Sequence, residues 1–132
     1  EESDWSSDVC SSDLHRRVEE IRDPASGIQI GLSTHAPAQA ERAVAAGADY
    51  VAIGPIYATG TKPTAQPVTL DYVRWAAAHV RIPWFAIGGI NLGNLEAVLA
   101  AGAQRICVVS AILNAADVAA ECRKYRARLD AA

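Results

Sequence analysis

The sequence lacks a long apolar run and an excess of charge of one sign. None of its hydrophobic stretches approaches the roughly 20 residues of a transmembrane helix, and the acidic, polar N-terminus does not resemble a signal peptide. The formal net charge of −3 over 132 residues gives no broad basic surface for nucleic acid or anionic lipid. We therefore expect neither a membrane nor a nucleic acid as partner. Any phosphorylated ligand must be bound locally, by backbone N–H groups and a few side chains.

Cysteine is also scarce. Cys10, Cys107 and Cys122 are odd in number and widely spaced, and no C-x-x-C pair occurs. This pattern excludes a disulfide framework and a cysteine-based zinc site. Cys107 lies in an apolar run and Cys122 on a helix pattern, so we expect two ordinary buried thiols. A cytoplasmic, reducing setting follows.

The first 14 residues differ from the rest. The segment EESDWSSDVCSSDL is rich in Ser and Asp and has no hydrophobic periodicity. Such a composition is typical of a disordered tail, and the segment also resembles the translation of a sequencing adapter. We expect residues 1–14 to be a disordered or artefactual tail and residues 15–132 to be the domain.

Four short apolar runs divide the domain, at residues 28–33, 50–55, 83–89 and 105–110. They are continuous rather than alternating, which favours strands buried on both faces, as in a parallel sheet. Between and after them, apolar residues recur every three or four positions, which predicts helices over 36–46, 70–80, 92–101 and 115–129. Thr69 and Asn91 are the expected N-caps of the second and third helices. The β-α alternation favours right-handed crossovers around a parallel sheet.

An internal sequence similarity suggests repeated units. The segments VAAGADYVAIG (44–54) and LAAGAQRICVV (99–109) each end a helix in Ala-Ala-Gly-Ala and enter a strand at once. Gly47 and Gly102 are then expected at the left-handed position after each helix. Such repeats predict an α/β fold of the TIM (β/α)8-barrel family, but a closed barrel takes about 250 residues. We expect a truncated half barrel of four βα units, strands 5–8; an open, doubly wound sheet is the alternative.

Polar and small residues follow each predicted strand, where barrel enzymes place their chemistry. The loop Thr59-Gly60-Thr61-Lys62 offers two hydroxyls, a backbone amide and an ammonium group, which suit a phosphate or pyrophosphate oxyanion. Gly88 and Gly89 let the backbone approach a ligand just before a capped helix, and Ser110 follows the next strand. The plainer alternatives are a tight turn at Gly88-Gly89 and a solvated loop at 59–62. Ser33 could bond only local backbone and His35 could be a cap or a merely exposed side chain.

Four segments together resemble the thiamine phosphate synthase family. They are GLSTH (31–35), GADYVAIGPIYATGTKP (47–63), IPWFAIGGIN (82–91) and VVSAI (108–112), in the family's order and spacing. The resemblance runs from about Ile28 to the C-terminus. A sister family of thiazole tautomerase-like proteins shares the Ser-x-His segment but lacks the T-x-T-K pattern.

The resemblance implies a transferase that joins hydroxymethylpyrimidine diphosphate to thiazole phosphate, giving thiamine phosphate and pyrophosphate. Ser33 would contact the pyrimidine diphosphate and Lys62 would bind the departing pyrophosphate, and these two are the implied catalytic residues. The implied substrate-binding residues are Thr59, Gly60 and Thr61, which touch the thiazole phosphate, and Gly89, Val109 and Ser110, which cradle it.

The resemblance also implies what is missing. The family's two magnesium-binding aspartates belong to strands 3 and 4, so this chain is expected to hold no Mg²⁺ and to be inactive alone. Open sheet edges would favour association of copies. The alternatives are a tautomerase-like enzyme that uses His35 as acid–base, and a non-catalytic phosphate-binding half-domain.

Overall fold

The computed structural model of the chain describes residues 18, 22–23, 25–58 and 68–131. The predicted tail at residues 1–14 and the predicted loop Thr59-Gly60-Thr61-Lys62 lie outside these residues. The described part contains all four predicted strand regions and the predicted helix regions between them.

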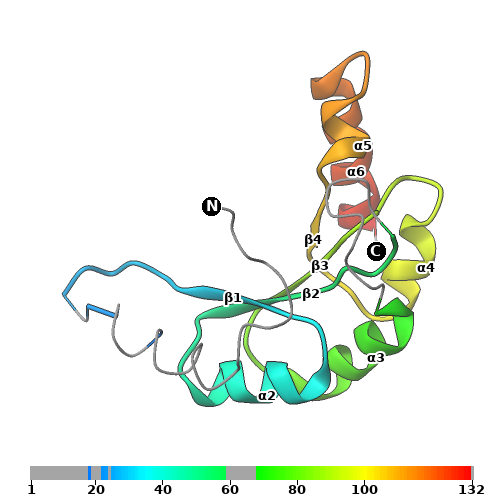
Figure 1. The fold of residues 1–132 in the computed structure, drawn as a ribbon. Helices are drawn as coiled ribbons and strands as arrows, with labels where there is room; N and C mark the ends of the chain where they lie inside the picture. Colours follow the sequence, from blue (N-terminus) through cyan, green and yellow to red (C-terminus); the bar gives the residue numbers. More distant parts are fainter. Residues whose placement is uncertain (1–17, 19–21, 24, 59–67, 132) are drawn as a thin grey trace.

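Four parallel strands form one sheet in the order β1-β2-β3-β4 (Figure 1). They are β1 (Gly31–Thr34), β2 (Tyr50–Ile53), β3 (Trp84–Ile87) and β4 (Ile106–Cys107). Each strand pairs with its neighbour in the sequence, and Leu32 aligns with Val51, which in turn aligns with Trp84. The prediction of a parallel sheet built from successive βα units is confirmed.

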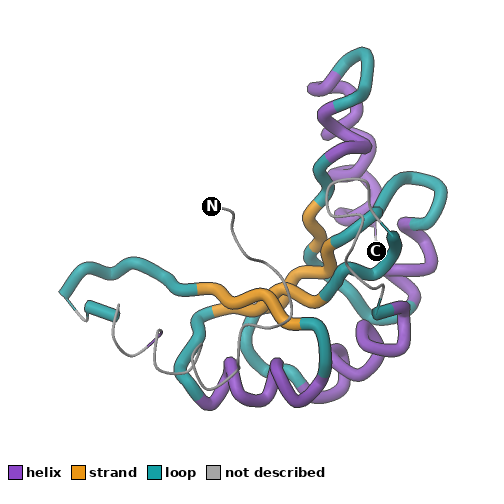
Figure 2. The backbone as a smooth tube through the Cα atoms, in the orientation of Figure 1, coloured by secondary structure: helices purple, strands orange, loops and turns teal. Residues whose placement is uncertain are grey.

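The helices lie between and after the strands (Figure 2). They are α2 (Pro37–Ala45), α3 (Thr69–His79), α4 (Leu95–Ala100), α5 (Ser110–Leu113) and α6 (Val118–Ala131). Figures 1 and 2 show α2, α3 and α4 following one another along one side of the sheet, with α5 and α6 beyond β4. In the described ranges, no helix is both long and apolar enough to cross a bilayer.

Burial alternates along the strands because the described helices cover a single face of the sheet. Val51 and Ile53 of β2 and Ala86 of β3 are fully buried towards the helices. On the opposite face Tyr50 is 36% exposed and Phe85 is half-buried. The expectation of strands buried on both faces is therefore wrong for the described residues, because the second face is only half-buried and Tyr50 on it is exposed.

The two similar segments, 44–54 and 99–109, have the same backbone conformation where each helix ends. Helix α2 ends at Ala45 with Ala46 as its C-cap, and the next two amides donate back into the helix, Gly47 to Val44 (3.0 Å) and Ala48 to Ala43 (3.1 Å). The end of α4 repeats the pattern, from Gly102 to Leu99 (3.0 Å) and from Ala103 to Val98 (3.3 Å). These are Schellman motifs. Gly47 and Gly102 have φ values of 93° and 116°, so their predicted left-handed conformation is confirmed.

The helix starts differ from those predicted. Thr69 is the first residue of α3, and its Oγ1 accepts a long hydrogen bond from the Asp71 amide (3.4 Å). Helix α4 begins at Leu95 because Asn91 caps the preceding turn instead. There the Asn91 Oδ1 accepts from the Asn94 amide (3.0 Å) and the Asn94 Oδ1 accepts from the Asn91 amide (2.9 Å), as in a capping box.

The predicted fourth helix, at 115–129, starts later and follows a short extra helix, α5. Of its apolar stripe only Tyr125 is buried, whereas Val118 is 43% exposed. Cys122 lies on this stripe and is exposed, so its predicted burial is wrong. Cys107 is half-buried on β4, and burial raises the pKa of its thiol, which keeps the thiol protonated.

A buried hydroxyl pair ties α3 to the end of β1. Thr34 is 2% exposed, and its Oγ1 lies 2.6 Å from the Tyr72 hydroxyl and 2.8 Å from the Ala52 carbonyl oxygen. The Tyr72 hydroxyl also lies 2.9 Å from the Ala36 carbonyl oxygen, to which it can donate. This pair fixes Thr34, the residue between Ser33 and His35, and thereby the carboxyl end of β1.

The two Schellman glycines are expected to respond differently to alanine. A Cβ at either site costs about 1–2 kcal/mol through the left-handed backbone. A Cβ at Gly102 would also lie 2.5 Å from the Ala77 Cβ, whereas nothing lies within 4 Å at Gly47. Overpacking adds about 1–3 kcal/mol, so Gly102→Ala should lower the urea midpoint clearly more than Gly47→Ala. Equal midpoints for the two variants would contradict the packing at Gly102.

Stability should fall at alkaline pH through Tyr72. Burial raises the pKa of Tyr72 to about 12 in the folded chain, against 10.0 for an ordinary tyrosine. Between these values the unfolded chain loses the proton that the folded chain keeps, so unfolding becomes easier as pH rises. Urea denaturation at pH 9 and pH 11 should show this loss, and Tyr72→Phe should make it smaller. An unchanged pH dependence in Tyr72→Phe would contradict the assignment.

Candidate functional site

The carboxyl ends of the four strands lie in a row, because parallel pairing aligns them at one edge of the sheet. Thr34 pairs with Ile53 at the ends of β1 and β2, and Ile87 pairs with Cys107 at the ends of β3 and β4. A Cβ at Gly54 would lie 2.2 Å from the Ile87 carbonyl oxygen, so the chain leaving β2 runs directly against the end of β3. All four predicted strand-end segments therefore begin at this edge.

Ser33 and His35 lie at the β1 end of the row, and both are exposed. The His35 Nδ1 lies 2.7 Å from the Gly54 carbonyl oxygen, and the Gln39 Oε1 accepts from the His35 amide (2.7 Å). A carbonyl oxygen can only accept, so Nδ1 carries the proton and Nε2 is the acceptor in the neutral ring. The ring is thus held at the end of β2, in agreement with the predicted exposed histidine.

The segment that follows β2 packs on the two glycines that follow β3. The Ile56 amide donates to Ile87 (2.9 Å), and the Tyr57 amide donates to Gly88 (3.1 Å). A Cβ at Gly89 would lie 2.8 Å from the Ala58 carbonyl oxygen. The described chain immediately before residue 59 therefore touches Gly88 and Gly89.

The chain also returns to this place after residue 67. The Val68 amide donates to the Pro55 carbonyl oxygen (2.7 Å), so the two described ends of this connection are joined. The predicted site residues Thr59, Gly60, Thr61 and Lys62 lie between these ends but outside the described residues. Their predicted contacts with phosphate stay predictions.

Gly88 and Gly89 form a turn that other residues could not make without strain. Their φ values are 107° and 68°, and a Cβ at Gly88 would lie 2.5 Å from the Pro55 Cα. The Asn94 Nδ2 donates to the Gly89 carbonyl oxygen (2.9 Å), and this hydrogen bond stabilises the turn. The Gly89 amide donates to none of the described residues.

Val109 and Ser110 follow β4, the neighbour of β3. Val109 is 47% exposed, Ser110 is exposed, and α5 begins at Ser110. The Val109 amide, like that of Gly89, donates to none of the residues in the described part of the chain. Gly89, Val109 and Ser110 therefore lie at adjacent strand ends, and their predicted contacts with phosphate stay predictions.

Ser33 lies at the other side of the row. Three strand spacings separate β1 from β4, about 14 Å at about 4.8 Å per spacing. At this separation Ser33 and Ser110 are too far apart to bind one phosphate group together. The described site residues form two groups, Ser33 at β1 and Gly89 with Val109 and Ser110 at β3 and β4.

A magnesium site does not fit the described residues. Within residues 18, 22–23, 25–58 and 68–131, no group of three or more His, Cys, Asp or Glu side chains could hold a metal ion. Mg²⁺ prefers carboxylate oxygens in octahedral geometry. No step of the chemistry is therefore assigned to a metal bound by these residues.

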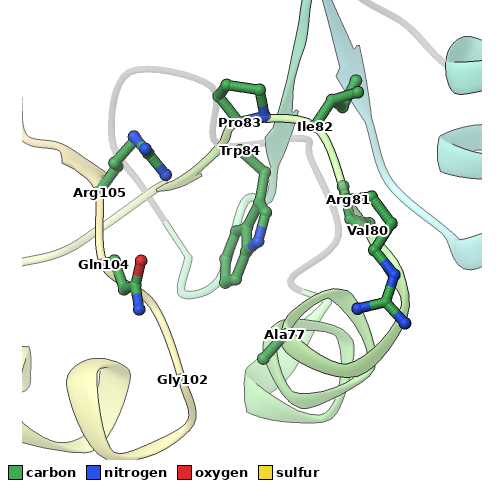
Figure 3. A pocket seen from close by; sticks show the side chains of 9 residues that line it. All are labelled: Ala77, Val80, Arg81, Ile82, Pro83, Trp84, Gly102, Gln104 and Arg105. Carbon is green, nitrogen blue, oxygen red and sulfur yellow. The ribbon is translucent and has the colours of Figure 1, made fainter.

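A cavity of about 280 Å³ lies at the opposite, amino-terminal end of β3 and β4 (Figure 3). Arg81 and Trp84 line one side, and Gly102 and Arg105 line the other. The C-cap residues of α3 and α4, Val80 and Ala101, lie in or next to its lining. This cavity therefore lies at the other end of the strands from the predicted site.

Sequence reasoning missed two supporting contacts of the glycine turn. Asn94 holds the Gly89 carbonyl oxygen, and Tyr57 and Ala58 pack over the turn. The spacing of Asn91 and Asn94, three residues apart after two glycines, was the available signal for a reciprocal cap. No local pattern signals the contact with residues 57–58, because it joins two different βα units.

Known proteins with similar sequences are named after one activity. A family model described as thiamine monophosphate synthase matches residues 11–112. A thiamine-phosphate synthase of Thermus thermophilus is 54% identical over 101 residues, which are 76% of this chain and 49% of that protein. A thiamine-phosphate synthase of Gloeobacter violaceus is 60% identical over 88 residues, 67% of this chain and 26% of that protein. The chain thus spans about half the length of the Thermus relative and about a quarter of the Gloeobacter one.

Solved structures agree on the fold. The thiamine phosphate pyrophosphorylase of Pyrococcus furiosus superposes with a TM-score of 0.77 at 33% identity, covering 86% of this chain and 54% of that one. A structure titled native KDPGal superposes with a TM-score of 0.60 at 20% identity, which shows a shared fold alone. The family model covers most of the chain, and the Thermus relative is matched over three quarters of it. The chain therefore belongs to the thiamine monophosphate synthase family.

Proposed function

We propose that this chain provides the phosphate-binding strand ends of a thiamine phosphate synthase. The reaction is a transfer: the C–O bond between the pyrimidine methylene and its diphosphate breaks, and the thiazole nitrogen forms the new C–N bond. The products are thiamine phosphate and pyrophosphate. The proposal rests on family membership and on the position of the glycine turn.

The observation that carries the proposal is the Gly88–Gly89 turn. It leaves the Gly89 amide without an acceptor among the described residues, next to the Val109 amide and the Ser110 hydroxyl on the neighbouring strand end. Backbone N–H groups at neighbouring strand ends suit a phosphate dianion, and the absence of Cβ atoms at Gly88 and Gly89 lets a ligand approach this turn closely. Gly89, Val109 and Ser110 would hold the thiazole phosphate in this arrangement.

The leaving diphosphate requires separate groups. The separation of Ser33 from Ser110 by three strand spacings suits two ligands, each with its own phosphate site. Ser33 would contact the pyrimidine diphosphate, Lys62 would neutralise the departing pyrophosphate, and Thr59, Gly60 and Thr61 would close on the thiazole phosphate. Holding both ligands in place and stabilising the leaving charge are the main sources of rate in such a step.

We further propose that the four βα units are strands 5–8 of a (β/α)8 barrel. The coverage of 49% of the Thermus relative and 54% of the Pyrococcus chain supports this assignment, as does the uncovered face of the sheet. Magnesium and the rest of the pyrimidine diphosphate site would then belong to the other four units. The chain alone should bind phosphate but lack the means to expel pyrophosphate.

Phosphate binding tests the proposed site directly. Titration of the ¹⁵N-labelled chain with inorganic phosphate should shift the amide resonances of Gly89, Val109 and Ser110. Ser110→Ala removes one hydrogen bond to a charged group, so the Kd should rise about tenfold or more. Ser26→Ala, the same change in the turn before β1, should leave the Kd unchanged. If the three amides do not shift, or if both variants behave alike, the proposed site is wrong.

Turnover by the 132-residue chain tests the half-barrel assignment. With hydroxymethylpyrimidine diphosphate, thiazole phosphate and Mg²⁺ present, pyrophosphate release should stay at the uncatalysed level, because the described residues offer no magnesium site. The full-length Thermus relative serves as the positive control. Release at a rate comparable with that relative would show that the chain is a complete catalyst.

A further inference from the structure

Both peptide groups of Gly89 are fixed by hydrogen bonds to their carbonyl oxygens. The Gly88 oxygen accepts from the Tyr57 amide (3.1 Å), and the Gly89 oxygen accepts from the Asn94 Nδ2 (2.9 Å). In a trans peptide the carbonyl and the next amide point in opposite directions. The two contacts therefore set the directions of the Gly89 and Ile90 N–H groups. The first donor is backbone, whereas the second is a side chain that a substitution can remove.

The orientation of the Asn94 carboxamide follows from its other partner. Its Oδ1 accepts from the Asn91 amide (2.9 Å), so its Nδ2 faces the Gly89 carbonyl oxygen. An N–H donor on one side and a carbonyl acceptor on the other leave a single arrangement for the two side-chain atoms. The half-buried Asn94 thus bridges two backbone groups on either side of Ile90. Aspartate has the same length and could accept from Asn91, but its carboxylate has no proton to donate.

This hydrogen bond matters because glycine resists rotation of its peptide groups less than other residues do. Gly88 and Gly89 have φ values of 107° and 68°, in the region that other residues rarely adopt. A rotation of the Gly89–Ile90 peptide would exchange the directions of the Gly89 carbonyl oxygen and the Ile90 N–H. Anions are bound by N–H groups and repelled by carbonyl oxygens. Such a rotation would therefore weaken the glycine turn as an anion site.

We propose that Asn94 is a positioning residue of the phosphate site, which holds the Gly89–Ile90 peptide in the orientation that binds phosphate. Asn94 acts through this peptide and not by contact with the ligand. This inference rests on the proposed function, because it takes Gly89 as a phosphate ligand. It also connects the site to the packing of the fold, since Asn94 is the N-cap residue of α4 and the next residue, Leu95, is buried.

A matched pair of aspartates separates the donor from the cap. Asn94→Asp keeps the Oδ1 that accepts from the Asn91 amide and replaces the donor to Gly89 with an oxygen. Asn91→Asp adds the same charge and keeps the Oδ1 that accepts from the Asn94 amide. The Kd for inorganic phosphate should rise roughly tenfold in Asn94→Asp, as for the loss of one hydrogen bond, and clearly less in Asn91→Asp. An equal rise in the two variants would overturn the proposal.

Two further variants test charge and stability as other causes. Asn94→Ala removes the donor without adding a charge, so it should weaken phosphate binding as well. Weaker binding in the aspartate variant alone would overturn the proposal. Gly47→Ala strains a left-handed residue that lies before β2, at the amino end of the strands, so it should leave the Kd unchanged. A Kd that rises as much in Gly47→Ala as in Asn94→Ala would show that lost stability is the cause.

The direction of the peptide can be measured without a ligand. Residual dipolar couplings of the weakly aligned, ¹⁵N-labelled chain report the direction of each N–H bond. The Ile90 coupling should change in both Asn94 variants, relative to the couplings of β3, and should stay the same in Asn91→Asp. An unchanged Ile90 coupling in both Asn94 variants would overturn the positioning role and leave the proposed function standing. A parent chain that does not bind inorganic phosphate would overturn both.

Discussion

Parallel pairing between neighbouring βα units is the constraint on which the rest of the molecule depends. Because successive strands are parallel neighbours and βα crossovers favour one hand, the described helices α2, α3 and α4 lie along one side of the sheet. The same pairing brings the four carboxyl ends to one edge, so Gly54 touches Ile87, and Ala58 touches Gly89. The proposed ligand site and the less buried face of the sheet, which carries Tyr50 and Phe85, are thus two results of one topology. Both follow from the order β1-β2-β3-β4.

Much of this arrangement could be predicted from the sequence, because its signals are local. Apolar runs gave the strands, and the Ala-Ala-Gly-Ala segments identified Gly47 and Gly102 as left-handed residues. The Gly88–Gly89 turn could be predicted in the same way, since two adjacent glycines after a strand usually mark a turn. The backbone conformation at these positions is set by residues that are close in the chain. It can therefore be predicted from a single sequence.

Features that depend on distant neighbours could not be predicted in this way. Continuous apolar strands suggested burial on both faces, and the stripe on α6 suggested a buried Cys122. The described structure buries one face and leaves Cys122 exposed. A hydrophobic pattern shows that a surface is fit for burial, whereas the presence of a covering element depends on which other segments the molecule contains. The contact of Ala58 with Gly89 joins two units and leaves no local trace either.

The repeated helix ends have an evolutionary consequence. Both α2 and α4 pass into the next strand through the same pair of backward hydrogen bonds around one glycine. Each such junction satisfies its own backbone groups through hydrogen bonds within a few residues. A gene that duplicates, deletes or exchanges a whole unit at these points therefore carries a working joint with it. Folds assembled from units with self-sufficient joints can change their number of repeats by recombination, without first evolving a new connection.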